Sequence, residues 1–443
     1  MLQGSGLTRG QVVRSSPMVL AGGLAAACGV SEAPPVASAR SVTLQIDNNW
    51  VSPPDRLSIM QAWLERVKRV YPNIKTELTD LAARPDTRAA AFASNTYGEL
   101  FMGDLTVNPT QNATIYQDID PTLKSLRFDT NSIYDIPVLT HYGGKRYGTL
   151  VQLNSWVWVY NKSMFKTNGV AEPTAKWTWN DHLDAAKRLA KPADNKWGMQ
   201  VVGDNPFQWF WQAGAEYVAK DGKSSLFTTK ECVNVLQWLI DIAQKFHVGP
   251  TFSENKAQAP KFVNGVMATD QLSAPGHPLN SQINNQFEWD VMPTPKHPTS
   301  GKPAPMLVTG GPMLVTQKAT QHDNLREAVQ ALVEFYNKEV QQLYNDGSRN
   351  PTSLPALKSV ANSAEALKPP PQNLKVVVDQ IATGRQLDVL LPGAGVQQFR
   401  NGVWTHLYAA LDGKLSAEQA ALNMKRDCDR VLSDATATIP DPR

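Results

Sequence analysis

The chain carries aromatic side chains of a kind that bind neutral polyols. It has 12 tryptophans in 443 residues. Trp156 and Trp158 alternate with valines in SWVWVYNK, and Trp209 and Trp211 lie close together in NPFQWFWQAGAEY. An indole ring can lie against the apolar C–H face of a sugar while polar neighbours bind its hydroxyl groups. Trp156, Trp209 and Trp211, together with Trp50, are therefore the candidates for carbohydrate binding, and core packing is the alternative for each of them. For Trp158, Trp63 and Trp238, which lie on strand or helix stripes that must be buried anyway, core packing is the expected role. Replacing Trp156 or Trp209 by alanine is expected to weaken binding without unfolding the protein.

Polar residues elsewhere in the chain could bind the hydroxyl groups of such a ligand. A carboxylate accepts two hydrogen bonds from adjacent hydroxyls, an arginine offers a fork of donors, and a glycine pair lets backbone N–H groups approach closely. We expect the polar contacts to come from Asp104, Asn154, Asp270, Gln271, Arg349 and the backbone of Thr309, Gly310 and Gly311. A surface ion pair or a helix cap is the alternative for Asp104 and Arg349.

Catalytic motifs are not found in the sequence. The seven histidines are scattered, and no HExxH, CxxC, GxSxG or GxxxxGK[ST] pattern occurs. An exported glycoside hydrolase would need two carboxylates facing one bond, and none of the many Asp and Glu residues stands in a motif that assigns it this work. We therefore expect a binding protein with no catalytic residues, no metal and no cofactor, and keep the hydrolase as an alternative.

The first elements of the folded part predict an α/β sheet. Ser41 to Asp47 (SVTLQID) reads as a short buried strand, a helix follows from about Leu57 to Val70, and YPNIKTEL returns as a second strand. Strand, helix and strand in so short a span indicate a parallel crossover unit. Ligands of such sheets bind beyond the carboxyl ends of the strands, which places Asn49 and Trp50 at a candidate site and also Asp104, which follows ELFMG.

Further elements follow from local signals. Trp156 to Tyr160 alternates as a strand and stops at an Asn-Lys turn. Thr178 stands three residues before Asp181, as an N-cap does, at the start of a helix. The remaining predicted helices cover residues 232–246, 325–344 and 416–432, the last one opening with a capping box of Ser416 and Gln419.

Residues 1–28 have the layout of a bacterial export signal. Arg9 and Arg14 are the only charges before Cys28, and a weakly apolar run too short to span a bilayer ends in three alanines beside that cysteine. This arrangement resembles the lipobox of bacterial lipoproteins, although Leu24 lies four residues before the cysteine where the pattern has three. We expect lipid attachment at Cys28, followed by a flexible tether over residues 29–40.

The alternative for the N-terminus is an ordinary cleaved signal in which Cys28 has no role. LTRGQVVRS also resembles a twin-arginine signal, but Gly10 stands where the second arginine should be, so the export route stays open. Either way the protein is expected outside the cytoplasm, in the periplasm or at the outer face of the cytoplasmic membrane.

The net charge of the chain limits the kinds of binding partner that it could attract. The formal net charge is +3, and it falls to +1 when Arg9 and Arg14 leave with the signal, so nothing is built to attract nucleic acid or an acidic membrane. No apolar run after residue 28 approaches spanning length. Cys232 and Cys428 lie in helix-like segments and are expected to be small buried thiols, with a disulfide between them as the alternative.

The order of motifs resembles a known family, the extracellular solute-binding proteins of ABC importers, family 1, which includes maltose-binding-like proteins. KRYGTLVQLNSWVWVYNKSMF, WTWNDHLDAAKRLA and KFVNGVMATD match family landmarks, and FEWDVMPTP, VTGGPMLVT, NDGSRNPTSLP and LDGKLSAEQA match later ones in the right order. Leu150 replaces the family's usual proline, and Gly214-Ala215 stands where the family has a glycine pair.

This resemblance implies a two-lobed periplasmic-binding-protein fold of type II-like α/β architecture, with a hinge and a ligand cleft between the lobes. It implies an N-terminal lobe of residues 41–150 plus 296–348 and a C-terminal lobe of residues 151–295 plus 349–443. It also implies a monomeric receptor that delivers its ligand, an oligosaccharide by the tryptophan argument, to ABC permease subunits. A glycerol phosphoester, a polyamine or another small polar solute is the alternative ligand.

Overall fold

The sheet of this protein is mixed, and it is built around two long antiparallel strands. The computed structural model describes residues 40–48, 54–81, 85–103, 109, 113–201, 206–273, 277–299, 306–346, 353–385 and 395–434. All of them belong to one compact unit, Ser38–Arg443. Within these residues seven strands form one sheet in the order β2-β1-β3-β9-β6-β7, and β8 also pairs with β6. The export signal, Cys28 and the tether up to residue 39 lie outside the described residues, as do Asn49, Trp50, Asp104 and Arg349.

The predicted crossover unit is confirmed. β1 (Val42–Asp47) and β2 (Ile74–Thr79) are parallel, and α1 (Pro54–Val70) connects them. β3 (Leu100–Met102) lies parallel to β1 on its other side. The buried stripe of α1 includes Trp63, whose indole N–H donates to the Ala331 carbonyl at 2.7 Å. The strand-helix-strand order thus forms because each element buries one apolar face against the next.

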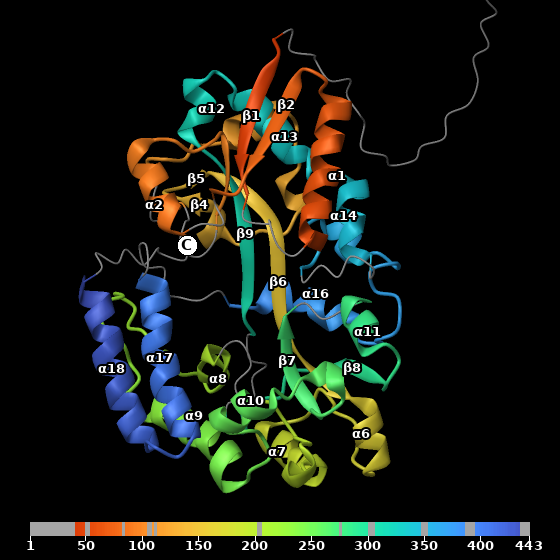
Figure 1. The fold of residues 1–443 in the computed structure, drawn as a ribbon, viewed down its shortest axis with the longest axis vertical. Helices are drawn as coiled ribbons and strands as arrows, with labels where there is room; N and C mark the ends of the chain where they lie inside the picture. The colour runs from red at the N-terminus through yellow and green to blue at the C-terminus, as the bar shows by residue number, and fades with distance from the viewer. Residues whose placement is uncertain are drawn as a thin grey trace, which may run out of the picture. The chain divides into compact units, whose positions relative to one another are not determined.

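Strands β6 (Gly148–Asn161) and β9 (Val308–Val315) run side by side, antiparallel, and connect the part of the sheet that holds β1 to β3 with the part that holds β7 and β8 (Figure 1). β7 (Thr269–Ser273) and β8 (Trp289–Met292) pair with the second half of β6. The pairing of β6 with β9 shifts register between Leu150 and Gln152. Such a bulge bends a strand locally and leaves backbone groups for other partners.

The remaining elements are helices and the short strands β4 (His141–Tyr142) and β5 (Lys145–Arg146), which pair with each other outside the main sheet. The helices of the first half are α2 (Pro85–Ser94), α4 (Asp120–Ser125), α5 (Pro137–Thr140), α6 (Lys162–Thr167), α7 (Trp179–Leu189) and α8 (Phe207–Gln212). Those of the second half are α9 (Lys230–Ile240), α10 (Phe252–Gln258), α11 (His277–Ile283), α12 (Gln317–Gln321), α13 (Leu325–Glu334), α14 (Lys338–Gln342), α15 (Lys358–Ala361), α16 (Leu374–Thr383), α17 (Gly395–Leu411) and α18 (Ala417–Asp434).

Two of the predicted helix starts are confirmed by their caps. The Thr178 side chain and Asp181 form a reciprocal capping box at α7. At α18 the Ser416 N–H donates to the Gln419 side chain at 2.9 Å, and the Gln419 N–H donates to the Ser416 hydroxyl at 3.2 Å. These side chains satisfy backbone N–H groups that a helix start leaves without intrahelical partners.

The helix predicted over residues 325–344 is wrong as a single element. It ends at Glu334, restarts as α14 and closes with a 3₁₀ turn, Leu343–Asn345. Asn337 has extended backbone geometry, and its side chain accepts from the Glu339 N–H, so it caps a new helix. The helix predicted over residues 232–246 also changes character, because a π-helical turn, Asp241–Lys245, follows Ile240.

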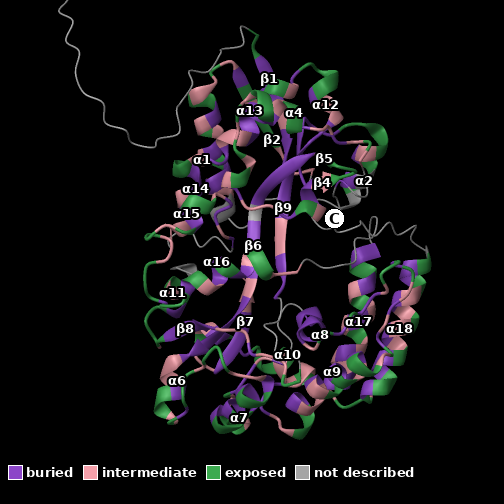
Figure 2. Ribbon diagram, turned by 180° about the vertical axis from the view of Figure 1, so that it is seen from behind, coloured by how far each residue is buried: buried purple, intermediate pink, exposed green. Residues whose placement is uncertain are grey.

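The buried apolar side chains gather in separate clusters. One surrounds β1 to β3, α1 and α13 and includes Trp63 and Phe335. The largest other cluster joins one face of β6 to α7, α8, α9, α17 and α18. Figure 2 shows buried residues along the strands and exposed residues mainly on the helices. This mixed α/β arrangement confirms the predicted fold class, and the predicted lobe boundaries stay a prediction.

Both cysteines of the described region are buried and unpaired. Cys232 and Cys428 have no exposed surface and belong to the cluster that α9 and α18 share. The predicted buried thiols are confirmed, and no disulfide joins them.

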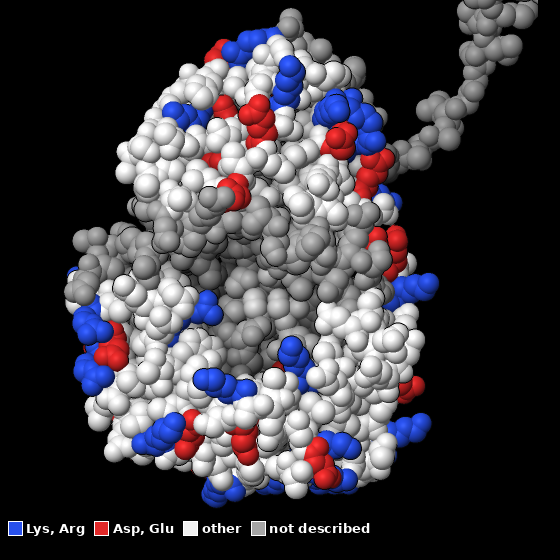
Figure 3. Space-filling view, viewed as in Figure 1, with Lys and Arg blue, Asp and Glu red and all other residues white. Residues whose placement is uncertain are grey.

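On the face drawn in Figure 3, basic and acidic side chains are interspersed. Among the residues that the structure describes, no helix combines the length and apolar character that crossing a membrane requires.

Candidate ligand-binding site

β6 and α8 contribute the candidate tryptophans Trp156, Trp209 and Trp211, and also Trp158, to one apolar cluster. Trp156 and Trp158 lie two positions apart and therefore on the same side of the strand. Trp158 is fully buried, whereas Trp156 is partly exposed and packs against the same cluster. The Trp158 ring meets Trp209 of α8 edge-on, with 5.6 Å between ring centroids, and Trp209 meets Trp179 at 4.9 Å. The side chains of Trp156, Trp158, Trp209 and Trp211 are named the tryptophan face below.

A neutral imidazole lies next to this face. The His182 ring approaches Trp158 edge-on at 4.8 Å, and its Nε2 is 2.7 Å from the Thr269 hydroxyl. Complete burial lowers the pKa of His182 to about 3 because the charged form loses its hydration. The residue is therefore uncharged at physiological pH and adds no electrostatic attraction for an anionic ligand.

The fourth tryptophan has a cationic neighbour that sequence reasoning missed. The Arg385 guanidinium carbon lies 4.9 Å from the centre of a Trp211 ring. Its two terminal nitrogens donate to the Glu216 carboxylate, each at 2.9 Å. No local pattern signals this contact, because Arg385 follows α16, far along the chain. The paired carboxylate offsets the arginine charge at this end of the tryptophan face.

The indole nitrogens divide the tryptophans into two groups. Trp63, Trp179, Trp197 and Trp289 each donate to a carbonyl or amide oxygen. Five others are buried at Nε1 without a hydrogen-bond partner among the described residues: Trp156, Trp158, Trp209, Trp211 and Trp238. A buried indole N–H usually finds a partner. Four of these five form the tryptophan face.

Polar residues of β6 and β9 adjoin the tryptophan face. Asn154, largely buried, lies on the same side of β6 as Trp156, and it stands opposite Thr309 in the pairing of β6 with β9. Gly310 and Gly311 follow Thr309; Gly310 is partly exposed and Gly311 is buried. The structure thus brings Asn154, the glycine pair and Trp156 to adjacent positions on two strands.

The pair Asp270 and Gln271 is divided by the pleat of β7. Gln271 stands opposite Trp158 and so shares its side of the sheet. Asp270 stands opposite Val159, on the other side, and its Oδ1 accepts from the Gln271 N–H at 2.7 Å. Of the two predicted residues, only Gln271 joins the tryptophan face.

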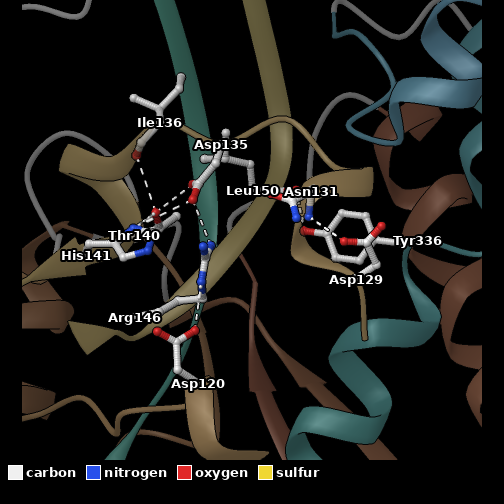
Figure 4. Close-up of polar contacts among 10 residues, drawn as sticks. All are labelled: Asp120, Asp129, Asn131, Asp135, Ile136, Thr140, His141, Arg146, Leu150 and Tyr336. Carbon is white, nitrogen blue, oxygen red and sulfur yellow. Dashed lines mark hydrogen bonds and ion pairs between the residues drawn. The ribbon is translucent and has the colours of Figure 1, made fainter. Parts of the chain in front are cut away.

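A polar network fixes the start of β6 (Figure 4). Arg146 donates to Asp135 at 2.7 Å and to Asp120 at 3.1 Å. Thr140 donates to the other oxygen of Asp135 at 2.6 Å. Burial and the nearby arginine lower the pKa of His141, which lies in the same network. The arginine lies two residues before Gly148, so these contacts position the strand that carries the tryptophan face.

Among the described residues no group of three or more His, Cys, Asp or Glu side chains is arranged to hold a metal ion.

Proteins of known structure share this fold. Solved structures with the same fold include three solute-binding proteins. The ABC substrate-binding protein Lmo0181 from Listeria monocytogenes, in complex with cycloalternan, has a TM-score of 0.69 at 19% identity, covering 88% of this chain and 98% of its own. Maltose-bound MalE3 of T. maritima has a TM-score of 0.67 at 17% identity, covering 87% and 98%. UgpB from Mycobacterium tuberculosis, in complex with glycerophosphocholine, has a TM-score of 0.69 at 14% identity, covering 89% and 99%.

These likenesses establish the two-lobed α/β fold of periplasmic sugar-binding proteins. The family model of the bacterial extracellular solute-binding proteins matches residues 52–343, and the chain belongs to this family. No curated protein sequence is significantly similar to the chain. The family resemblance seen in the sequence motifs is therefore confirmed.

Proposed function

We propose that this protein is the exported receptor of an ABC importer and that it captures a carbohydrate, in particular an oligosaccharide, for delivery to a membrane permease. The ligand would lie between an N-terminal lobe of residues 41–150 plus 296–348 and a C-terminal lobe of residues 151–295 plus 349–443. Burial of a ligand on two sides supplies affinity, and a closed form gives the permease a state that differs from the empty receptor. The proposed ligand-binding residues are Asn49, Trp50, Asp104, Asn154, Trp156, Trp209, Trp211, Asp270, Gln271, Gly310, Gly311 and Arg349.

The observation that carries this proposal is the set of unpartnered indole N–H groups on the tryptophan face. Trp156, Trp158, Trp209 and Trp211 are buried at Nε1 without a partner among the described residues, whereas Trp63 and Trp179 are paired. Aromatic rings with free donors suit a ligand that has apolar C–H faces and hydroxyl acceptors. Carbohydrates have both features.

A ligand screen tests the proposal. A tight ligand stabilises the folded protein by mass action and so raises the midpoint of thermal unfolding. At a free-ligand concentration 100 times the Kd, the added stability is about 2.7 kcal/mol. We expect a rise with maltose, longer maltodextrins or cyclic glucans, and saturable heat in calorimetry with the same sugar. Unchanged midpoints and no heat across a broad panel of mono- and oligosaccharides would refute carbohydrate binding.

A receptor and a hydrolase differ in what happens to the sugar. The family and the related structures are binding proteins, and we propose that this chain has no enzymatic activity. Incubation with a bound oligosaccharide should return it intact in chromatography. Release of shorter sugars would instead support the glycoside hydrolase.

A glycerol phosphodiester is the second candidate ligand, since UgpB, with the same fold, binds glycerophosphocholine. The neutral His182 and the pairing of Arg385 with Glu216 favour an uncharged ligand over a phosphate. Glycerophosphocholine belongs in the same thermal screen. If the midpoint of thermal unfolding rises with this compound and with no sugar, the proposed ligand becomes a glycerol phosphodiester instead of a carbohydrate.

We also propose that Cys28 carries a lipid that holds the receptor at the outer face of the membrane. The proposal depends on the small residues before this cysteine and the Ala/Pro-rich tether after it. Intact-mass measurement of the mature protein should give a chain that starts at Cys28 with acyl mass. A chain that starts further along without acyl mass would identify an ordinary cleaved signal.

A further inference from the structure

Two buried glutamines have amide groups without partners. Gln208 of α8 has no exposed surface, and Gln271 of β7 is 2% exposed. Neither the carboxamide oxygen nor the nitrogen of either residue has a hydrogen-bond partner within the described parts of the chain. A buried amide that pairs with nothing loses its hydration and gains no hydrogen bond in return. These two side chains therefore lower the stability of the ligand-free protein.

A third glutamine, on the same helix α8, is also buried but has hydrogen-bond partners. Gln212 follows Gln208 by one helical turn and is also 2% exposed. Its Oε1 accepts from the Trp179 indole at 3.1 Å, and its Nε2 lies 3.2 Å from the Met306 sulfur, a weak acceptor. Burial on this helix does not by itself prevent pairing, so Gln208 differs from Gln212 in lacking a hydrogen-bond partner among the described residues.

The position of Gln208 links it to the tryptophan face. Gln208, Trp211 and Gln212 are spaced three and four residues apart, so they share one side of α8. On that side Gln212 contacts Met306, and Arg385 both covers Trp211 and donates its backbone N–H to the Met306 carbonyl at 2.9 Å. This side of the helix thus faces the segment that leads into β9.

The position of Gln271 links it to the same face from the sheet. It stands opposite Trp158, whose ring lies 5.6 Å from that of Trp209, the residue after Gln208. Gln271 therefore borders the tryptophan face beside Trp158, and Gln208 borders it on the side of α8 that carries Trp211.

We propose that Gln208, together with Gln271, recognises hydroxyl groups of the carbohydrate and determines its specificity; this inference rests on the proposed function. A carboxamide presents an acceptor and two donors side by side, and a hydroxyl group both donates and accepts. The indole N–H groups of the tryptophan face add donors for further hydroxyl or ring oxygens. Because neither amide contacts solvent, a ligand reaches them only when these side chains rotate or their neighbours shift.

Replacement of Gln208 by methionine tests this role. Gln208→Met keeps the side-chain length and removes only the amide. In the ligand-free protein we expect an unchanged or higher Tm, because an unpaired polar group is removed. For a carbohydrate that stabilises the wild type, for example maltose or a maltodextrin, we expect the Kd to rise by about tenfold or more. Gln271→Met should behave in the same way.

Gln212→Met is the matched control. It removes an equally buried amide from the same helix, but it leaves the Trp179 indole N–H without its acceptor, so Tm should fall. The opposite Tm responses of Gln208→Met and Gln212→Met would support the inference. An unfolded or less stable Gln208→Met protein would make Gln208 a structural residue and overturn it.

Binding separates the two proposals. If the wild type binds a carbohydrate and Gln208→Met binds it with the same Kd, the role of Gln208 is refuted while the proposed function stands. If the wild type responds to no carbohydrate in the panel, the proposed function is refuted, and the assignment of hydroxyl recognition to the glutamines is refuted with it.

Discussion

The hydroxyl of Tyr344 donates a 2.6 Å hydrogen bond to the carbonyl of Val151, at the bulge where β6 shifts register against β9. Tyr336 donates to the neighbouring Leu150 carbonyl at 2.7 Å. Val151 lies within the register shift, and Leu150 stands opposite Pro312, which has no N–H to donate. Two tyrosines that follow α13 supply donors to these carbonyls. The bent segment of β6 is thereby tied to the helical layer.

Removal of one of these donors should weaken the fold. Tyr344→Phe leaves the Val151 carbonyl buried without this donor, and we expect the free energy of unfolding to fall by about 1–3 kcal/mol. Urea denaturation measures the change. Tyr142→Phe, at a position 37% exposed, is the control and should stay within about 0.5 kcal/mol of the wild type. Equal stability of both variants would show that water or another group replaces the tyrosine.

The two tryptophans proposed for ligand contact should differ in their effect on stability. Trp209 is 1% exposed and packs against Trp158 and Trp179, so Trp209→Ala should lower the free energy of unfolding by about 3–5 kcal/mol. The sequence alone led to the expectation that Trp209→Ala does not unfold the protein, because the burial of Trp209 among other rings is visible only in the structure. Trp156 is only partly buried, and Trp156→Ala should cost less stability while weakening sugar binding. Parallel thermal melts and titrations of both variants give the comparison, and an unchanged Kd in Trp156→Ala would remove this residue from the site.

The stability of the folded protein should depend on pH through the carboxyl group of Asp427. Hydrogen bonds from Arg426 and then His406 lower the pKa of Asp427 to about 2, from an ordinary 3.8. A carboxylate whose pKa is lower in the folded state stabilises it above the unfolded pKa and loses this effect as pH falls through the folded pKa. Asp427→Asn should therefore be less stable than the wild type at pH 6, and the difference should shrink between about pH 4 and pH 2.

Urea titrations at several pH values measure this dependence. Asp194→Asn, at an exposed position on the 3₁₀ turn Pro192–Asp194, is the control. A difference between wild type and Asp427→Asn that stays constant down to pH 2 would contradict the assignment.

The two buried thiols should be unreactive in the folded protein. Burial raises the pKa of Cys232 to about 11 and also raises that of Cys428, so neither forms the nucleophilic thiolate at neutral pH. In a Cys28→Ser chain, Ellman's reagent should detect almost no thiol before denaturation and both thiols after it in guanidinium. Detection of no thiol in the denatured chain would indicate a disulfide that this structure lacks.

Local patterns predicted the elements that depend on neighbouring residues. The alternation in SVTLQID and the helical stripe with Trp63 predict β1 and α1, because burial of one face requires that spacing. The boxes of Thr178 with Asp181 and of Ser416 with Gln419 also follow from short spacing. The break at Asn337 was not predicted, since the apolar stripe continues through it and the cap lies within that stripe.

The sequence by itself determined the α/β class, the family and the supply of aromatic and polar residues, because each follows from composition, periodicity or the order of motifs. The tertiary structure decided which of these residues come into contact. A strand register that differs by one residue reverses every side chain, so only the pairing of β7 with β6 puts Gln271 beside Trp158 and Asp270 on the other side. Likewise, only the packing of α8 leaves Gln208 unpaired while Gln212 finds Trp179, because a hydrogen-bond partner distant in the chain is supplied by folding and not by local sequence.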